Sequence, residues 1–248
     1  MKPVAGLVVV VPVHDEEELL GPCLASIEQS LRHPAVRRLP SCIVVTLDAC
    51  SDRSAEVAAR GLRAQDEIVS IGSRNVGAAR AAGTARGIDA LGIAPARIWL
   101  AHTDADTTVP HHWLARQLTM ASTVDAVAGV VRVADWSDHD RATRRAFDRS
   151  YRGSRLRRHP HVHGANLGLR ASAYLDVGGF APRACSEDHA LWALLQASGR
   201  PVRSSRRIWV STSARRIGRA GGGFADTLVR LEAATTSPVD THTAPVGP

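Results

Sequence analysis

Lysine is almost absent from this chain of 248 residues, because it occurs only at Lys2 and nearly all of the basic charge is arginine. The formal net charge is +7 at neutral pH. Arginine makes forked contacts with phosphates and carboxylates, so this balance fits an anionic ligand, an anionic membrane surface or nucleic acid. A genome-wide preference for arginine and alanine is the alternative explanation, so only local clusters of arginine carry information.

Aromatic residues are also scarce, at 4% of the chain. Proteins that bind single-stranded nucleic acid stack bases on such rings, so we expect no nucleic-acid partner. The four cysteines form no C-x-x-C pair, which argues against a zinc site; they are Cys23, Cys42, Cys50 and Cys185. No G-x-G-x-x-G follows the first apolar segment, which disfavours a dinucleotide dehydrogenase.

Long hydrophobic runs are missing as well. The apolar segment from Leu7 to Val13 is too short to span a bilayer, and acidic residues follow it at once. No secretory leader is visible. We therefore expect a cytoplasmic protein with reduced thiols, with peripheral contact to the inner face of an anionic membrane as an option. The sequence does not indicate the oligomeric state.

Hydrophobic residues make up 44% of the chain, which supports one large domain, with two small domains as the alternative. Apolar runs alternate with helical patterns in the first half. The pattern predicts strands at 7–11, 42–47, 67–71 and 97–101 and helices at 16–31, 52–62 and 75–91. This order predicts an α/β fold with a mostly parallel sheet and helices on both faces. We expect the acidic run from Asp15 to Glu18 to stabilise the start of the first helix.

The second half has a less regular pattern. It predicts helices at 110–121, 187–197 and 224–233 and strands at 125–133, 166–170 and 202–210. Residues 138–158 are rich in arginine and form either a helix or a loop, and they fit an acidic acceptor, an anionic lipid surface or plain solvation. The Thr, Pro and Ala content from residue 235 onward is typical of a disordered tail.

Two carboxylates, Asp104 and Asp106, follow the predicted strand that ends at Ala101. Hard anionic oxygens near one point suit Mg²⁺ or Mn²⁺. Such a cation is useful mainly where a polyanion such as a diphosphate also binds it. An acidic turn that merely ends a strand is the alternative.

Polar residues follow each of the other early strands, at Pro12–Glu16, Asp48–Asp52 and Arg74–Gly77. Carboxyl ends of parallel strands meet at one rim, where ligands bind. Helix capping alone would account for any one of these segments, but four together are harder to explain that way.

Two later segments fit the same rim. A carboxylate in Ser186–His189 is placed to act as a general base, although both acids there also suit a helix N-terminus. Arg215, Arg216 and Arg219 lie near three glycines and suit a phosphate clamp, with a solvated loop as the alternative.

Taken in order, these segments resemble family 2 glycosyltransferases of the GT-A fold over residues 6 to 230. The matching segments are Pro12-Val13-His14-Asp15-Glu16-Glu17, Asp48-Ala49-Cys50-Ser51-Asp52, Asn75-Val76-Gly77-Ala78-Ala79-Arg80, Asp104-Ala105-Asp106, Gly164-Ala165-Asn166 to Arg170, Gly178-Gly179-Phe180 and Glu187-Asp188. The resemblance implies a single domain over 1–232. It has a Rossmann-like nucleotide-sugar half at 1–106, an acceptor half at 107–232 and a disordered tail at 233–248.

The resemblance also implies roles for particular residues. Asp104 and Asp106 would hold a divalent metal, Mn²⁺ or Mg²⁺, against the diphosphate of a donor that is usually UDP-linked. Asp188 would deprotonate the acceptor hydroxyl, and transfer would invert the anomeric centre. The residues expected to bind the donor are Pro12, His14, Glu16, Asp48 (which would contact the base), Asn75, Arg80, Asp104, Arg215 and Arg216.

Three positions depart from the family pattern. Asp15 replaces a usual asparagine, and Leu47 replaces an acidic residue, which weakens the inference of uridine. A late metal-binding histidine is missing from residues 211–216. His161 and His163 are substitutes for it, although a plain loop role is the expected one for both.

Two other functions remain as alternatives. A nucleotidyltransferase that makes the donor would show a glycine-rich basic segment after the first strand, whereas this chain is acidic there. A sugar-nucleotide-binding protein without turnover would have no need of Asp104, Asp106 and Asp188.

Overall fold

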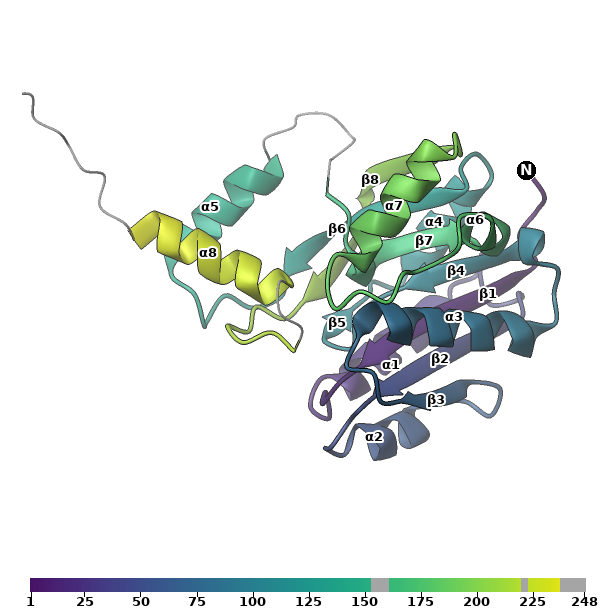
Figure 1. Cartoon of the computed structure of the whole chain (residues 1–248), viewed down its shortest axis with the longest axis horizontal. Coiled ribbons are helices and arrows are strands. Elements are labelled where there is room, and N and C mark those ends of the chain that lie inside the picture. The colour runs from purple at the N-terminus through teal and green to yellow at the C-terminus, as the bar shows by residue number, and fades with distance from the viewer. Residues whose placement is uncertain (153–160, 220–222, 237–248) are drawn as a thin grey trace, which may run out of the picture.

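One eight-stranded sheet forms the centre of the protein, which we describe from a computed structural model (Figure 1). The structure describes residues 1–152, 161–219 and 223–236. The strands lie in the order β3-β2-β1-β4-β7-β6-β8-β5. They are β1 (Gly6–Val13), β2 (Ser41–Asp48), β3 (Glu67–Ile71), β4 (Ile98–His102), β5 (Thr107–Thr108), β6 (Ala126–Val133), β7 (Leu167–Arg170) and β8 (Val202–Thr212).

The first four strands in the sheet, β3, β2, β1 and β4, all run parallel. Strand β7 is antiparallel to both β4 and β6, while β6 and β8 are parallel. The mostly parallel sheet predicted from the alternating pattern is therefore confirmed. Because β7 is reversed, its amino end reaches the rim where β4 has its carboxyl end, and the segment before β7 joins that rim.

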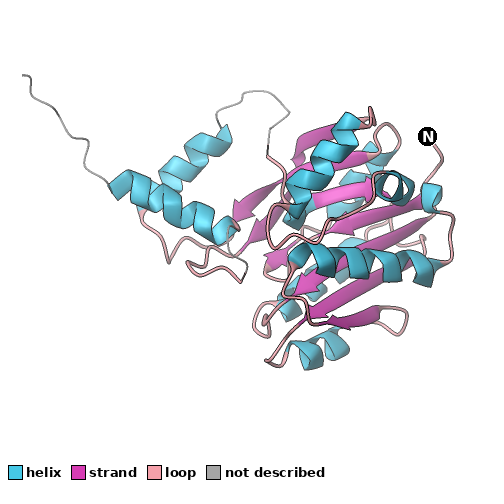
Figure 2. Ribbon diagram, viewed as in Figure 1, coloured by secondary structure: helices cyan, strands magenta, loops and turns pink. Residues whose placement is uncertain are grey.

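Helices cover both faces of the sheet, as expected (Figure 2). Side chains alternate along β1, so Leu7, Val9 and Val11 pack in the core on the α1 side, while Val8 and Val10 pack in the core on the α3 side. The helices are α1 (Leu20–Leu31), α2 (Ser54–Gly61), α3 (Val76–Leu91), α4 (Trp113–Ala121), α5 (Arg141–Arg152), α6 (Ala171–Asp176), α7 (Glu187–Ala197) and α8 (Phe224–Thr236).

The start of the first helix differs from the prediction. Helix α1 begins at Leu20, and its first turn contains no acidic residue. Asp15 adopts a left-handed backbone conformation with φ of 52°. The carboxylates of Asp15 and Glu17 accept hydrogen bonds from the loop after β2 instead of complementing the helix. The expectation that the acidic run stabilises this helix terminus was therefore wrong.

Four short elements were not predicted: the two-residue strand β5, helix α6 and the 3₁₀ helices Pro95–Arg97 and Gly164–Asn166. The arginine-rich segment forms helix α5 from Arg141 to Arg152, and residues 153–158 of that segment lie outside the described part. Helix α8 continues to Thr236, past the expected domain end at 232. The rest of the expected tail, 237–248, also lies outside the described residues.

Helices α5 and α8 pack against each other to one side of the sheet (Figure 1). Their contact is apolar, because Phe147 and Leu228 are buried there beside Ala214. Among the described residues, no helix combines the length and the apolar character that crossing a bilayer requires.

Candidate active site

A cavity of about 740 Å³ opens at the rim where β1, β2 and β4 end. Ten of the eleven residues predicted for the site line it: Pro12, His14, Glu16, Asp48, Asn75, Arg80, Asp104, Asp106, Asp188 and Arg215. These residues come from both halves of the chain. The parallel order of the strands explains why segments so far apart in sequence reach one place.

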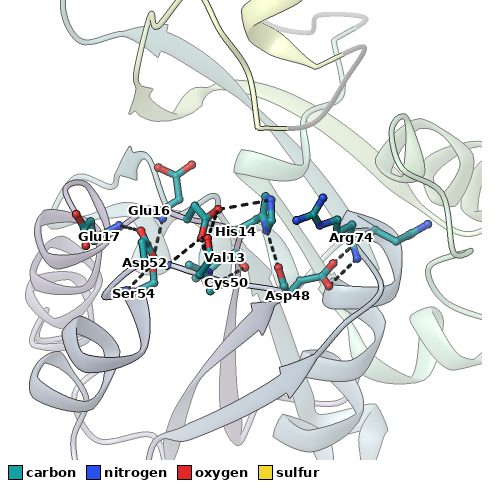
Figure 3. A network of polar contacts seen from close by, with 12 residues as sticks. Val13, His14, Glu16, Glu17, Asp48, Cys50, Asp52, Ser54 and Arg74 are labelled. Atoms are coloured by element: carbon teal, nitrogen blue, oxygen red, sulfur yellow. Dashed lines mark hydrogen bonds and ion pairs between the residues drawn. The ribbon is translucent and has the colours of Figure 1, made fainter.

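The loops after β1 and β2 are joined by reciprocal hydrogen bonds (Figure 3). The backbone N–H of Arg53 donates to the Glu17 carboxylate at 2.9 Å, and the N–H of Glu17 donates to the Asp52 carboxylate at 2.8 Å. The N–H of Glu16 donates to Ser54 Oγ at 2.9 Å. These bonds fix the wall of the cavity that carries His14 and Glu16.

Asp48 is almost fully buried at the end of β2 and holds the next loop in place. Its Oδ1 accepts from the N–H groups of Ser73 and Arg74, both at 2.8 Å, and its Oδ2 accepts from the N–H of Asn75 at 2.6 Å. Arg74 has a left-handed φ of 47°, which turns the chain around the carboxylate. His14 Nδ1 donates to the Asp48 carbonyl at 2.7 Å (Figure 3).

Replacing Asp48 with alanine should lower the free energy of unfolding by about 2–4 kcal/mol, because a hydrogen bond to a charged group contributes about 1.5–3 kcal/mol and water replaces part of what is lost. Urea unfolding followed by circular dichroism measures the change. Asp89→Ala, at an exposed position on α3, is the control and should change stability little. Equal stabilities of the two variants would contradict the role of Asp48.

Arg80 of α3 is fully buried and connects two acidic side chains. Its Nη2 pairs with Asp104, and its Nε donates to Glu187 Oε1 at 3.0 Å. Burial raises the pKa of Glu187, Arg80 opposes the shift, and nearby Asp188 adds to it. One guanidinium therefore ties the end of β4 to the start of α7, which carries the predicted base.

Arg215 makes a second connection of the same kind. Its Nη1 donates to Glu16 Oε2 at 2.9 Å, and its Nη2 lies 3.0 Å from Asp106 Oδ2. Thr212 Oγ1 donates to Asp106 Oδ1 at 3.1 Å. Burial and the neighbouring negative charge of Asp104 raise the pKa of Asp106 to about 6, and Arg215 limits the rise.

The two acids after β4 fit a divalent cation. The side chain of Asp104 is 39% exposed, so it reaches the cavity, and Asp106 is held in a site that is crowded with carboxylates. Carboxylate oxygens are the ligands that Mg²⁺ and Mn²⁺ prefer. Within the described ranges, the only three-membered cluster of potential ligands is Asp15, Cys50 and Asp52. Further ligands to a cation at Asp104 and Asp106 would therefore come from a diphosphate and water.

Asp188 lies at the start of α7 and is partly exposed to the cavity. Its Oδ2 accepts from the N–H of Gly164 at 2.7 Å, and its Oδ1 accepts from the N–H of His189 at 2.7 Å. A Cβ at position 164 would lie 2.4 Å from Arg80 Nη2, so any larger residue there would displace the Arg80 guanidinium. These contacts orient the carboxylate while leaving it accessible from the cavity.

Arg216 is placed differently from the prediction. Its Nη1 donates to the Asp138 carbonyl at 2.9 Å and pairs with Glu232 of α8. Of the two arginines, the structure brings Arg215 to the cavity, while Arg216 is absent from the described lining. The sequence analysis missed Glu187 as the partner of Arg80 and Gly164 as the donor to Asp188, since neither pairing has a local signal.

Comparison with known proteins agrees with this arrangement. Residues 8–178 match the family described as Glycosyl transferase family 2. No curated protein sequence matches the chain.

Solved structures with the same fold include two complexes with nucleotide sugars. Mannosyltransferase PcManGT from Pyrobaculum calidifontis, in complex with GDP-Man and Mn²⁺, has a TM-score of 0.66 and 18% identity over 88% of this chain and 59% of that one. S. aureus TarS 1-349 in complex with UDP-GlcNAc has a TM-score of 0.65 and 12% identity over 93% and 66%. This chain thus spans less than two thirds of either structure, and identities this low show the fold alone.

Proposed function

Since this chain belongs to glycosyl transferase family 2, we propose that it transfers a sugar from a nucleotide-diphosphate donor to a hydroxyl acceptor, with inversion and with the help of a divalent metal. The observation that carries the proposal is that Asp104, Asp106 and Asp188 line one cavity. The proposed metal ligands and the proposed base would therefore act within one cavity.

The proposed reaction is a single displacement. The acceptor oxygen attacks the anomeric carbon from the face opposite the diphosphate, and the new C–O bond forms as the bond to the diphosphate oxygen breaks. Asp188 takes the hydroxyl proton, and the departing nucleoside diphosphate keeps the electron pair. The N–H groups of Gly164 and His189 orient the base for this step. General-base catalysis contributes about 10²–10⁴ in rate.

Asp104 and Asp106 are the proposed metal ligands. When bound, the cation would neutralise the charge that grows on the leaving diphosphate. Arg215 supports the same end of the cavity, because its guanidinium lies 3.0 Å from Asp106. It supplies a fixed positive charge beside the proposed leaving group.

We propose UDP as the nucleotide, on the resemblance to family members that usually use uridine. The TarS complex contains UDP-GlcNAc, whereas the PcManGT complex contains GDP-Man. A direct comparison of UDP and GDP therefore tests this part of the proposal separately.

Binding of UDP with Mn²⁺ should raise the melting temperature. At about 100 times the Kd, a ligand stabilises the folded state by about 2.7 kcal/mol, which corresponds to about 5–10 °C for a domain of this size. Differential scanning fluorimetry with UDP or GDP, each with Mn²⁺ or with EDTA, measures the shift. We expect the largest shift with UDP and Mn²⁺ together.

The Asp106→Asn variant should lose the metal-dependent part of this shift, and Asp89→Asn should keep it. An equal shift in EDTA would count against a metal at Asp104 and Asp106. A larger shift with GDP would reject uridine and leave the metal proposal intact.

Two further expectations belong to the proposal. Hydrolysis of the donor without an acceptor would separate a transferase from a protein that only binds sugar nucleotides, because a binding protein would release no sugar.

Contact with an anionic membrane surface would rest on exposed arginines of α5, which are Arg141, Arg144, Arg145 and Arg149.

A further inference from the structure

One side of the cavity is apolar, and we call it the apolar end. It is lined by Phe147, Phe224 and Leu231. It lies beneath α5 and α8, whose contact contains Phe147, Phe224 and Leu231. Most small-molecule sites combine apolar walls with a few placed polar groups, and the lining of this cavity contains both.

Aromatic rings are concentrated at the apolar end in a chain that has few of them. Two of the three phenylalanines, Phe147 and Phe224, are here, with ring centroids 5.8 Å apart and perpendicular planes. Trp136 lies 5.4 Å from the Phe147 ring, and His163 lies 6.2 Å from the Phe224 ring. Of these rings, Phe147, His163 and Phe224 line the cavity, and Phe224 is the more exposed of the two phenylalanines. An aromatic ring offers a rigid apolar surface to a ligand.

The segment from His161 to Gly164 connects the apolar end to the predicted base. Val162 and His163 line the cavity, and the next N–H, that of Gly164, donates to Asp188 at 2.7 Å. A molecule whose hydroxyl reaches Asp188 would therefore come close to this segment. The ring of His163 in turn lies beside the ring of Phe224.

We propose that the acceptor carries an apolar group, aryl or alkyl, next to the hydroxyl that receives the sugar, and that the apolar end binds this group. The inference rests on the proposed transferase function and specifies its acceptor. Carbohydrate acceptors carry hydroxyls over most of their surface, and the side chains of Phe147, Phe224 and Leu231 offer no hydrogen-bond partners for them. An apolar group buried there gains about 25 cal/mol per Å² that it removes from water.

Binding of simple apolar alcohols tests this inference without turnover. Isothermal titration calorimetry with 2-naphthol as the aryl probe and 1-octanol as the alkyl probe would be run on the full chain, with maltotriose as the carbohydrate probe. We expect at least one apolar alcohol to bind, and UDP with Mn²⁺ not to displace it. The alcohol with the lower Kd shows whether the apolar group is aryl or alkyl.

Polar substitutions at the apolar end should weaken this binding. Phe224→Gln and Leu231→Gln should each raise the Kd of the apolar probe by about tenfold or more, the effect of losing one buried apolar side chain. Leu194→Gln is the matched control, because Leu194 is an exposed leucine on α7 and should bind as the wild type does. Both positions at the apolar end are partly exposed, and melting curves of all three variants check that they fold.

The outcomes separate this inference from the proposed function. Binding of neither alcohol, or equal Kd values in the Leu231→Gln and Leu194→Gln variants, would overturn the inference. Tighter binding of maltotriose than of both alcohols would overturn it as well. If the wild type bound an alcohol but neither bound UDP nor hydrolysed the donor, that result would instead reject the proposed transferase function.

Discussion

The Asp188→Asn variant should transfer sugar about 10²–10⁴ times more slowly than the wild type, because an amide cannot take the acceptor proton. Donor binding should not change. Asparagine keeps an oxygen that can accept from the N–H of Gly164, which in the wild type lies 2.7 Å from Asp188, so the start of α7 should keep its position. Initial rates with saturating donor, together with the melting shift from UDP and Mn²⁺, give both quantities.

The control for this variant is Asp89→Asn, which removes one negative charge from an exposed position on α3. It should transfer sugar at the wild-type rate. An Asp188→Asn protein with more than half of the wild-type rate would reject Asp188 as the base. A loss of both the rate and the UDP shift would indicate a positional role instead.

The Arg80→Leu variant should lose about 3–5 kcal/mol of stability, since removing one partner of a buried ion pair leaves an uncompensated charge. Arg80 is fully buried and holds both Asp104 and Glu187. Of these two acids, Glu187 is the buried one, so it accounts for most of the loss. Urea unfolding measures the effect.

The loss should depend on pH in a defined direction. Burial raises the pKa of Glu187 above its usual 4.5, Arg80 opposes the shift and Asp188 adds to it, so without Arg80 the rise becomes larger. A carboxyl whose folded pKa is raised binds more protons in the folded state, and stability falls as pH rises above 4.5 toward that folded pKa. The deficit of Arg80→Leu should therefore be smallest near pH 4.5 and grow toward neutral pH.

Two further variants make this result interpretable. Arg86→Leu removes another α3 arginine, which pairs with Glu67 at the surface, and exposed pairs contribute only about 0–1 kcal/mol. The double variant Arg80→Leu/Glu187→Leu also removes the buried carboxylate that has lost its partner, so it should recover much of the lost stability. A single variant as stable as Arg86→Leu, or a pH-independent deficit, would contradict the role assigned to Arg80.

The strands and the rim were predictable because they depend on local patterns. The run of valines from Val8 to Val11 indicates a strand buried on both faces, and the polar residues that follow each parallel strand must meet at one edge. The short strand β5 has only two residues, too few for a hydrophobic period. The acidic run after β1 suggested a helix start, but side chains in it accept hydrogen bonds from the loop after β2. Whether such a carboxylate complements a helix or bonds a distant loop depends on the tertiary structure, which the local sequence does not show.

The pairings inside the site were not predictable for the same reason. Asp104 and Asp106 could be identified from their place after a strand, yet nothing in the sequence indicates that Arg80 lies against one and Arg215 against the other. The apolar end is formed by Phe147 and Phe224, which belong to two helices that pack together. Helix packing of this kind is set by shape and by loop geometry, for which one sequence offers no direct signal.

The bond between Arg215 and Glu16 joins positions 199 residues apart. Closing so long a segment of unfolded chain costs entropy, so we expect this contact to form after contacts between nearer residues have shortened the effective loop. The four parallel strands lie within the first 102 residues, whereas this bond requires Arg215, which follows the last strand. During synthesis, the side of the cavity that Arg215 closes can therefore be completed only after residue 215 has emerged from the ribosome.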